Sequence, residues 1–274
     1  MNQYVSVTIQ PLETSEAEIL MANLSDLSFY AFEQTQNQLI AYCKSEDFDE
    51  IEMNKFIPSS AGFTKEIIED KNWNAQWESD FQPVVVDDFV AIRASFHSPI
   101  STVKHDIVIT PKMSFGTGHH ATTYLMIAQM EGLNFENKTV LDFGTGTGVL
   151  AILAEKLGAA KVLAIDYDEW SIHNSIENIE ANQCKNIKVE QSDTLGKMEP
   201  VDLILANINL NVLSAASQQL ADCIKANGFL LISGFLDTDE EEINQLFTEV
   251  GMTKRKTMQK EKWLCILFQK NNAQ

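Results

Sequence analysis

The most informative segment of the chain is Asp142–Gly148, which reads Asp-Phe-Gly-Thr-Gly-Thr-Gly. An apolar, strand-like run leads into it and an apolar, helix-like run follows, so it predicts a turn between a strand and a helix. Gly144, Gly146 and Gly148 let the backbone turn sharply and approach a ligand without interference from a Cβ atom. In an open α/β sheet ligands bind at this place, beside the free N–H groups that begin the helix. We therefore expect a ligand site at Asp142–Gly148.

Strands and helices alternate along the chain from this stretch onward. The strand-like runs are Thr139–Phe143, Lys161–Asp166, Ile187–Gln191, Asp202–Asn207 and Phe229–Ser233. The helix-like runs between them are Val149–Leu157, Glu169–Asn182, Leu210–Ala226 and Asp237–Val250. This alternation predicts an α/β fold with a doubly wound, Rossmann-like parallel sheet. The last two runs, Thr253–Gln259 and Lys262–Gln269, predict a terminal antiparallel hairpin.

Three features favour S-adenosylmethionine over a dinucleotide as the ligand. The glycines follow a G-x-G-x-G spacing, whereas the dinucleotide fingerprint is G-x-G-x-x-G. A terminal hairpin is not expected of a simple dinucleotide-binding half. A second glycine-bearing loop, Phe115–Gly118, precedes the first strand, where it can fold over a ligand.

Polar residues end three of the predicted strands. Asp166 can hydrogen-bond ribose hydroxyls, which suits either ligand. Asp193 is placed to meet an adenine amino group, or it is simply a turn residue. Asn207 points into the ligand crevice, or it caps the helix that begins near Leu210, a role that Asn209 fills equally well.

The first 60 residues predict a small α+β domain. Strand-like runs at Tyr4–Ile9, Phe29–Glu33 and Gln38–Tyr42 alternate with helix-like runs at Thr14–Asn23 and Glu46–Phe56. The stretch Pro58–Gly62 breaks the pattern, so we place a domain boundary there. We expect a small domain at residues 1–60, a linker at 61–73 and the larger domain at 74–274. Trp73 and Trp77, four residues apart, are interpreted as a packing pair.

The charge of the chain is strongly negative and unevenly spread. The formal net charge is −19, and residues 1–80 hold 15 acidic residues against 4 lysines. This balance argues against bare nucleic acid as a partner and favours a basic protein, although acidic surfaces also serve solubility. The four scattered cysteines predict free thiols, and we expect no metal site. The chain has no apolar run of membrane-spanning length and no secretory signal, so we expect a cytoplasmic enzyme.

Several segments resemble the PrmA family, the bacterial methyltransferases of the large-subunit ribosomal protein numbered eleven. The most specific is Met113–Thr123, which contains Phe-Gly-Thr-Gly-His-His-Ala-Thr-Thr. The resemblance continues through Asp142–Ala159, through Asp166-Tyr167-Asp168 and the helix with Asn178 and Asn182, and through Ala206-Asn207-Ile208. It covers residues of about 70–270, and Asn209-Leu210-Asn211 departs from the family pattern, which bears on the shape of the acceptor site.

The resemblance implies a class I methyltransferase that uses S-adenosyl-L-methionine to methylate lysine side chains and the α-amine of a basic ribosomal protein. Carried over by motif, the cofactor contacts fall on Thr123, Gly144, Asp166 and Asn207. The small domain is then the substrate-recognition domain. No motif residue is an obvious general base, so the catalytic residues stay unknown. The alternatives are a methyltransferase of RNA or of another protein, a nicotinamide oxidoreductase and a non-enzymatic cofactor-binding module.

Overall fold

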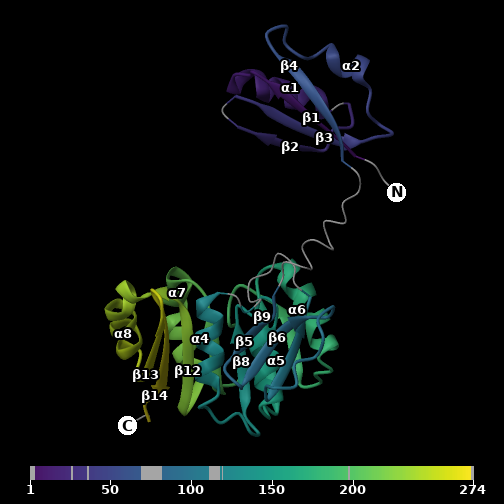
Figure 1. Ribbon diagram of the computed structural model, residues 1–274. Helices are drawn as coiled ribbons and strands as arrows, with labels where there is room; N and C mark the ends of the chain where they lie inside the picture. The colour runs from purple at the N-terminus through teal and green to yellow at the C-terminus, as the bar shows by residue number, and fades with distance from the viewer. Residues whose placement is uncertain are drawn as a thin grey trace. The chain divides into compact units, whose positions relative to one another are not determined.

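The structure is a computed structural model, and it describes residues 4–25, 27–35, 37–68, 82–110, 118, 120–196 and 198–272. The chain divides into two compact units, residues 1–80 and residues 81–274. The strands of the two units form separate sheets (Figure 1), and each unit has its own buried apolar residues.

The N-terminal unit is an antiparallel sheet of four strands with the order β2-β3-β1-β4. Its elements are β1 (Tyr4–Gln10), α1 (Thr14–Ser25), β2 (Ala31–Gln34), β3 (Leu39–Lys44), α2 (Glu50–Asn54) and β4 (Gly62–Ile68). This βαββαβ order is that of a split βαβ, or ferredoxin-like, unit. Its core is buried between the sheet and helix α1, with Val7, Ile9 and Leu20 among the residues that are excluded from solvent.

The expected linker at residues 61–73 is wrong in its first part, because Gly62–Ile68 forms strand β4. This strand pairs with β1 along its whole length, from Gly62 opposite Gln10 to Ile68 opposite Tyr4. Without β4, the outer edge of β1 would present unpaired N–H and C=O groups. Residues 69–73, together with Trp73 and Trp77, lie outside the described residues.

The second helix of this unit is shorter than expected. It begins at Glu50 rather than Glu46, because the Asp49 carboxylate accepts hydrogen bonds from the N–H groups of Ile51 and Glu52 and so caps the helix there.

The C-terminal unit contains the expected α/β sheet, with seven strands in the order β10-β9-β8-β11-β12-β14-β13. The strands are β8 (Thr139–Phe143), β9 (Lys161–Asp166), β10 (Ile187–Gln191), β11 (Val201–Asn207), β12 (Ile224–Leu236), β13 (Met252–Lys260) and β14 (Trp263–Lys270). The first five are parallel, whereas β14 runs antiparallel to both β12 and β13. The predicted terminal hairpin is therefore confirmed.

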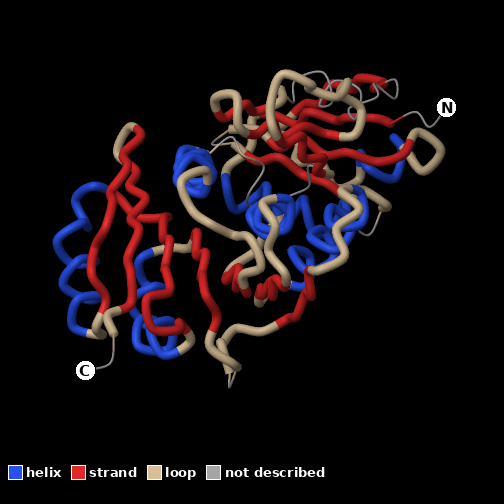
Figure 2. The backbone as a smooth tube through the Cα atoms, turned by 90° about the horizontal axis from the view of Figure 1, so that it is seen from below, coloured by secondary structure: helices blue, strands red, loops and turns tan. Residues whose placement is uncertain are grey.

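Helices cover both faces of this sheet (Figure 2). They are α4 (Ala121–Met130), α5 (Val149–Lys156), α6 (Glu169–Ala181), α7 (Leu210–Asp222) and α8 (Glu240–Glu249), with the short turn η1 (Asp237–Asp239) before α8. Strand residues alternate between the two cores, as strand period 2 requires. In β11, Leu203 and Leu205 face the core formed with α4 and α5, whereas Ile204 and Ala206 face the core formed with α7 and α8.

A second, smaller sheet of this unit was not expected. It consists of β5 (Val84–Val86), β6 (Val90–Ala94) and β7 (His105–Ile109), in the order β5-β6-β7. This sheet packs on the outer side of α4, α5 and α6, and all five residues of β6 are buried. These three helices thus lie between two sheets.

Two further observations concern the cysteines and the helices. The cysteines are all free thiols, as predicted. Within the described ranges, no helix combines the length and the apolar character needed to cross a membrane.

Candidate functional site

The glycine turn has the strained backbone that only glycine adopts easily. Gly144, Gly146 and Gly148 have φ angles of 78°, 54° and 80°, in the left-handed region that side chains disfavour. A Cβ atom on Gly144 would also lie 2.3 Å from Cγ2 of Ile208. The turn therefore requires glycine at position 144 for two independent reasons.

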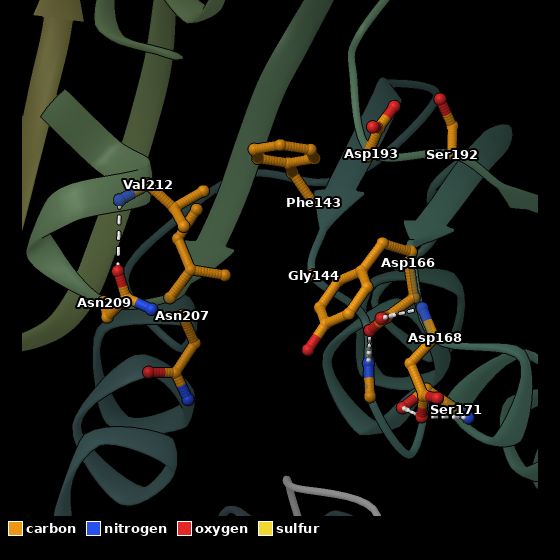
Figure 3. Close-up of a pocket in the computed structure, with 13 residues that line it drawn as sticks. Phe143, Gly144, Asp166, Asp168, Ser171, Ser192, Asp193, Asn207, Asn209 and Val212 are labelled. Carbon is orange, nitrogen blue, oxygen red and sulfur yellow. Dashed lines mark hydrogen bonds between the residues drawn. The ribbon is translucent and has the colours of Figure 1, made fainter. Parts of the chain in front are cut away.

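A pocket of about 470 Å³ opens where β8, β9 and β11 end (Figure 3). This volume lies in the range of small-molecule and cofactor sites. Its lining residues are Phe143, Gly144, Gly146, Asp166, Tyr167, Asp168, Ser171, Ser192, Asp193, Asn207, Ile208, Asn209 and Val212. Of the four residues expected to bind the cofactor, the pocket brings together Gly144, Asp166 and Asn207.

Asp166 ends β9 on one wall of the pocket and is tied to the glycine turn. Its carboxylate accepts hydrogen bonds from the N–H of Gly146 at 2.9 Å and from the N–H of Asp168 at 3.1 Å. A carboxylate has about four acceptor positions, so two remain for ligand hydroxyls. Asp168 has a structural role, because its side chain caps α6 by accepting from the N–H and hydroxyl of Ser171.

Asp142 lies beneath the turn and is 1% exposed. Burial raises the pKa of its carboxyl group to about 7, the hydrogen bond donated by the Thr145 hydroxyl at 2.6 Å opposes this rise, and the nearby Asp166 carboxylate adds to it. The glycine turn is thus built over a carboxyl group whose charged form is disfavoured by burial.

Asn207 ends β11 on the opposite wall, and it does not cap α7. The cap is Asn209, whose side-chain oxygen accepts from the N–H of Val212 at 3.0 Å. The Asn207 amide instead donates to the hydroxyl of Thr123 at 3.3 Å. Its oxygen Oδ1 is buried and has no hydrogen-bond partner among the described residues. Thr123 itself is fully buried on α4 and does not line the pocket, so it lies behind Asn207.

Sequence reasoning missed Ile208 and Gly234 as determinants of this wall. Gly234 has a φ angle of 103°, and a Cβ atom there would lie 2.2 Å from the carbonyl oxygen of Ile208. The Ile208 N–H in turn donates to the carbonyl of Ser233. The loop after β11 therefore lies against backbone at Gly144 and Gly234. A glycine directly after the predicted strand Phe229–Ser233 was the available signal.

Of the other residues that the sequence singled out, Asp193 and His120 are described by the structure, whereas most of the loop Phe115–Gly118 is not. Asp193 lines the pocket together with Ser192, on the same side as Asp166 (Figure 3). Residues 115–117 of the loop Phe115–Gly118 lie outside the described residues. His120 caps α4, since its ring nitrogen Nδ1 accepts from the N–H of Thr122.

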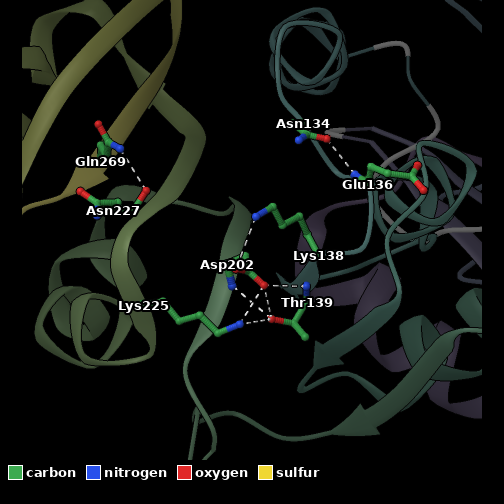
Figure 4. Close-up of polar contacts among 8 residues, drawn as sticks. All are labelled: Asn134, Glu136, Lys138, Thr139, Asp202, Lys225, Asn227 and Gln269. Atoms are coloured by element: carbon green, nitrogen blue, oxygen red, sulfur yellow. Dashed lines mark hydrogen bonds and ion pairs between the residues drawn. The ribbon is translucent and has the colours of Figure 1, made fainter.

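A separate polar cluster lies at the amino ends of β8 and β11, away from the pocket (Figure 4). The Asp202 carboxylate accepts from the N–H and hydroxyl of Thr139 and from the ammonium of Lys225 at 2.9 Å. Burial alone would raise the pKa of Asp202, but these donors bring it down to about 2. The cluster joins two adjacent strands and is structural.

The pocket fits a nucleoside that carries an amino-acid chain. Asp166 offers acceptors for hydroxyl groups, and Asn207 places on the opposite wall an amide whose buried oxygen has no hydrogen-bond partner among the described residues. The glycine turn lets a ligand approach the backbone, because no Cβ atom projects from it. These groups are compatible with S-adenosylmethionine, whose ribose hydroxyls and ammonium group are hydrogen-bond donors.

Comparison with known proteins identifies the relatives of this chain. The family model for "Ribosomal protein L11 methyltransferase (PrmA)" matches residues 4–271. A protein of that name from Bacteroides thetaiotaomicron is 37% identical over 268 residues, which cover 94% of this chain and 95% of the relative. A second, from Chlorobaculum tepidum, is 38% identical over 269 residues, which cover 93% of each chain.

Solved structures agree with this match. The ribosomal protein L11 methylase of Lactobacillus delbrueckii subsp. bulgaricus has a TM-score of 0.65 and 28% identity, and the match covers 70% of this chain and all of that one. A methyltransferase from Pyrococcus furiosus, at 17% identity and a TM-score of 0.53, shares the fold over 61% of this chain and 90% of that one. The sheet order and the terminal hairpin are those of a class I methyltransferase. This chain therefore belongs to the ribosomal protein L11 methyltransferase (PrmA) family.

Proposed function

We propose that this protein transfers methyl groups from S-adenosyl-L-methionine to amino groups of ribosomal protein L11, both lysine side chains and the N-terminal α-amine. The observation that carries the proposal is the pocket at the carboxyl ends of β8, β9 and β11, in a chain that matches the family model over residues 4–271. The substrate follows the name of the relatives.

The cofactor is held by Gly144, Asp166 and Asn207. The Asp166 carboxylate accepts from the ribose hydroxyls with the positions that Gly146 and Asp168 leave open. Because Gly144 has no side chain, the ligand can approach the backbone there. The buried oxygen of Asn207 accepts a hydrogen bond from the cofactor or from the incoming amine. Thr123 acts behind Asn207, as the acceptor that holds its amide. Asp193, on the side of Asp166, is placed to accept from the adenine amino group.

The chemistry needs a neutral amine. The bound sulfonium supplies an electrophilic methyl group and leaves as a neutral thioether. A lysine ammonium has a pKa of about 10.4 and an α-ammonium of about 8, so the amine must lose a proton to water or to a neighbouring group before attack. Transfer into a pocket that excludes water disfavours the charged form and lowers the pKa of the amine. The protein thus acts by desolvating and orienting the amine beside the methyl group.

The N-terminal domain recognises the substrate. It carries 15 acidic residues against 4 lysines within residues 1–80, and such a surface attracts a basic protein and speeds its encounter. Because added salt screens this attraction, the Michaelis constant for L11 should rise as ionic strength rises. A salt-insensitive Michaelis constant would count against this role. We place the reaction in the cytoplasm, where ribosomal proteins are made.

A labelled-cofactor assay tests the proposal. The enzyme is incubated with methyl-labelled S-adenosylmethionine and, separately, with ribosomal protein L11, with the remaining large-subunit proteins and with ribosomal RNA. We expect label in L11, on lysines and on the α-amine after peptide mapping. Label in RNA or in another protein, with none in L11, would replace the substrate assignment while leaving the cofactor site intact.

A further inference from the structure

Helix α6 and its C-cap residue, Asn182, present three asparagines on one face, at the spacing of one helical turn. Asn174, Asn178 and Asn182 are four residues apart and therefore lie above one another. Asn174 and Asn178 are 1% and 0% exposed. A buried amide is costly unless it is hydrogen-bonded, so the partners of these side chains show what the face does.

Asn182 binds strand β7 and its own helix, because its nitrogen also donates to the backbone carbonyl of Asn178 at 2.7 Å. Its oxygen accepts from the N–H of Val108 at 3.0 Å, and its nitrogen donates to the carbonyl of Val108 at 2.6 Å. The side chain thus pairs with β7 as a neighbouring strand would. Among the described residues, β7 is an edge strand that pairs with β6, so this pairing satisfies the N–H and C=O groups of Val108 on the outer edge of β7.

Asn178 binds β7 and the glycine turn together. Its oxygen accepts from the N–H of Thr110, directly after β7, at 2.7 Å. Its nitrogen donates to the carbonyl of Thr147 at 2.8 Å, between Gly146 and Gly148. The amide of Asn174 supports it from the preceding turn, as its oxygen lies 3.4 Å from the same nitrogen. A single buried side chain therefore joins two segments that are 37 residues apart in the sequence.

The glycine turn depends on α6 for its shape. A Cβ atom on Gly148 would lie 3.2 Å from the Cβ and 3.4 Å from the Cα of Ser175, so helix and turn are in direct contact there. The turn has left-handed backbone at Gly146 and Gly148 on either side of Thr147. Glycine gains conformational freedom when it is released. The hydrogen bond from Asn178 to the Thr147 carbonyl therefore adds a restraint to those on the N–H groups of Gly146 and Gly148, which donate to the Asp166 carboxylate and to the Thr145 carbonyl.

We propose that Asn178 is a positioning residue for the cofactor, which holds the Thr147 peptide and thereby keeps the glycine turn in its binding conformation. The residue does not line the pocket, so it acts through the turn rather than by contact. The proposal rests on the proposed cofactor site, because the turn is one wall of that site.

Asn178→Asp and Asn182→Ala separate this role from general support of β7. Asn178→Asp keeps an acceptor for the N–H of Thr110 but loses the donor to Thr147, and it places a second acceptor beside that carbonyl. Asn182→Ala loses both hydrogen bonds to β7 and the one to the backbone carbonyl of Asn178, but it leaves the hydrogen bonds of the Asn178 side chain to Thr110 and Thr147 in place. Binding of S-adenosylhomocysteine is measured by calorimetry, and stability by urea unfolding, for both variants and the wild type.

We expect Asn178→Asp to weaken S-adenosylhomocysteine binding by about tenfold or more, the effect of losing one buried hydrogen bond. Asn182→Ala should lower the unfolding midpoint while the affinity stays within about twofold of the wild type. Equal loss of affinity in the two variants, or an unchanged affinity in Asn178→Asp, would overturn the proposal.

Hydrogen exchange on the ligand-free protein tests the same link without the cofactor. The amides of Gly146 and Gly148 should exchange faster in Asn178→Asp than in Asn182→Ala, because only the first variant releases the Thr147 peptide. Equal exchange would contradict the proposal. If the wild type failed to bind S-adenosylhomocysteine, the proposed function would fail, whereas this exchange measurement would still decide the role of Asn178.

Discussion

The side-chain amide of Asn207, at the end of β11, donates a hydrogen bond to the hydroxyl of Thr123 on α4 across 3.3 Å, although 84 residues separate them in the sequence. In this contact the amide nitrogen of Asn207 is the atom that hydrogen-bonds within the protein. The nitrogen is committed to Thr123, and the oxygen is left without a partner among the described residues. The hydroxyl of a fully buried residue therefore controls a group on the pocket wall.

Replacement of the hydroxyl tests this relationship. Thr123→Val keeps the shape of the side chain but removes the acceptor, so the buried amide of Asn207 loses its partner. We expect cofactor affinity to fall by about tenfold, measured by calorimetry with S-adenosylhomocysteine. Thr123→Ser, which keeps the hydroxyl, is the control and should bind within about threefold of the wild type. If valine and serine behave alike, the hydroxyl has no part in positioning Asn207.

Gly144→Ala tests the contact between the glycine turn and the loop after β11. The new Cβ atom would meet Ile208 at 2.3 Å on a backbone with a φ of 78°, and we expect a loss of about 2–4 kcal/mol in the free energy of unfolding. Adding Ile208→Ala removes the clashing atom and should restore part of that loss.

Gly196→Ala is the matched control, because its φ is 55° but, apart from its chain neighbours, no heavy atom of the described residues lies within 4 Å of the new Cβ. It should show the cost of the backbone conformation alone, about 1–2 kcal/mol. Urea unfolding measures all three variants. A loss in Gly144→Ala no larger than that of Gly196→Ala would mean that the contact with Ile208 relaxes without cost.

The lowered pKa of Asp202 predicts that the free energy of unfolding falls in acid. Its pKa in the folded protein is about 2, below the value of about 3.9 in an unfolded chain. The stabilisation is therefore complete above about pH 4 and is lost as the pH falls from there towards 2. Since the cluster is partly exposed to solvent, Asp202→Asn should cost about 1 kcal/mol at pH 7 and progressively less below pH 4.

Lys225→Met removes the main charged donor to Asp202 and should give the same pH dependence, whereas Asp222→Asn on the surface of α7 should not. The comparison is made by urea unfolding between pH 7 and pH 3. A difference between Asp202→Asn and the wild type that stays constant with pH would contradict this account of the cluster.

The raised pKa of Asp142 predicts the opposite dependence on pH. Its pKa of about 7 in the folded protein lies above the unfolded value of about 3.9. Between these values the folded state holds a proton that the unfolded state has lost, so the free energy of unfolding falls as the pH rises. Asp142→Asn removes this term, and its stability relative to the wild type should rise between pH 4 and pH 8, by at most about 4 kcal/mol. Asp193→Asn, at an exposed acid of the same pocket, should show no such rise, and a flat difference for Asp142→Asn would refute the assignment.

Local pattern predicted most of the large sheet. Strands β8, β9 and β11 are buried on both faces, so each appears as a short apolar run, and β9 and β11 end in the polar residues Asp166 and Asn207. The strand β4 was missed because Gly62–Ile68 is solvent-exposed over most of its length and lacks the alternation of a half-buried strand. Its pairing with β1, 52 or more residues away along the chain, is a tertiary effect.

The parts of the site that belong to a local sequence motif could be predicted. The glycine turn and Asp166 belong to adjacent strands whose carboxyl ends meet at one edge of the sheet, so their proximity follows from the fold. The positions of Thr123 and Asn178 do not follow in that way. Each acts through a hydrogen bond to a segment distant in sequence, Asn207 for the first and Thr147 for the second, and no local spacing encodes such a contact.

The most direct test of the account is a calorimetric titration of S-adenosylhomocysteine into the wild type and into Asp166→Ala, with Glu169→Ala as a control that removes a nearby acid outside the pocket. Saturable binding to the wild type, weakened about 10–100-fold by Asp166→Ala and unchanged by Glu169→Ala, is the expected result. The absence of binding to the wild type, or equal affinity in Asp166→Ala, would contradict the assignment of this pocket as the cofactor site.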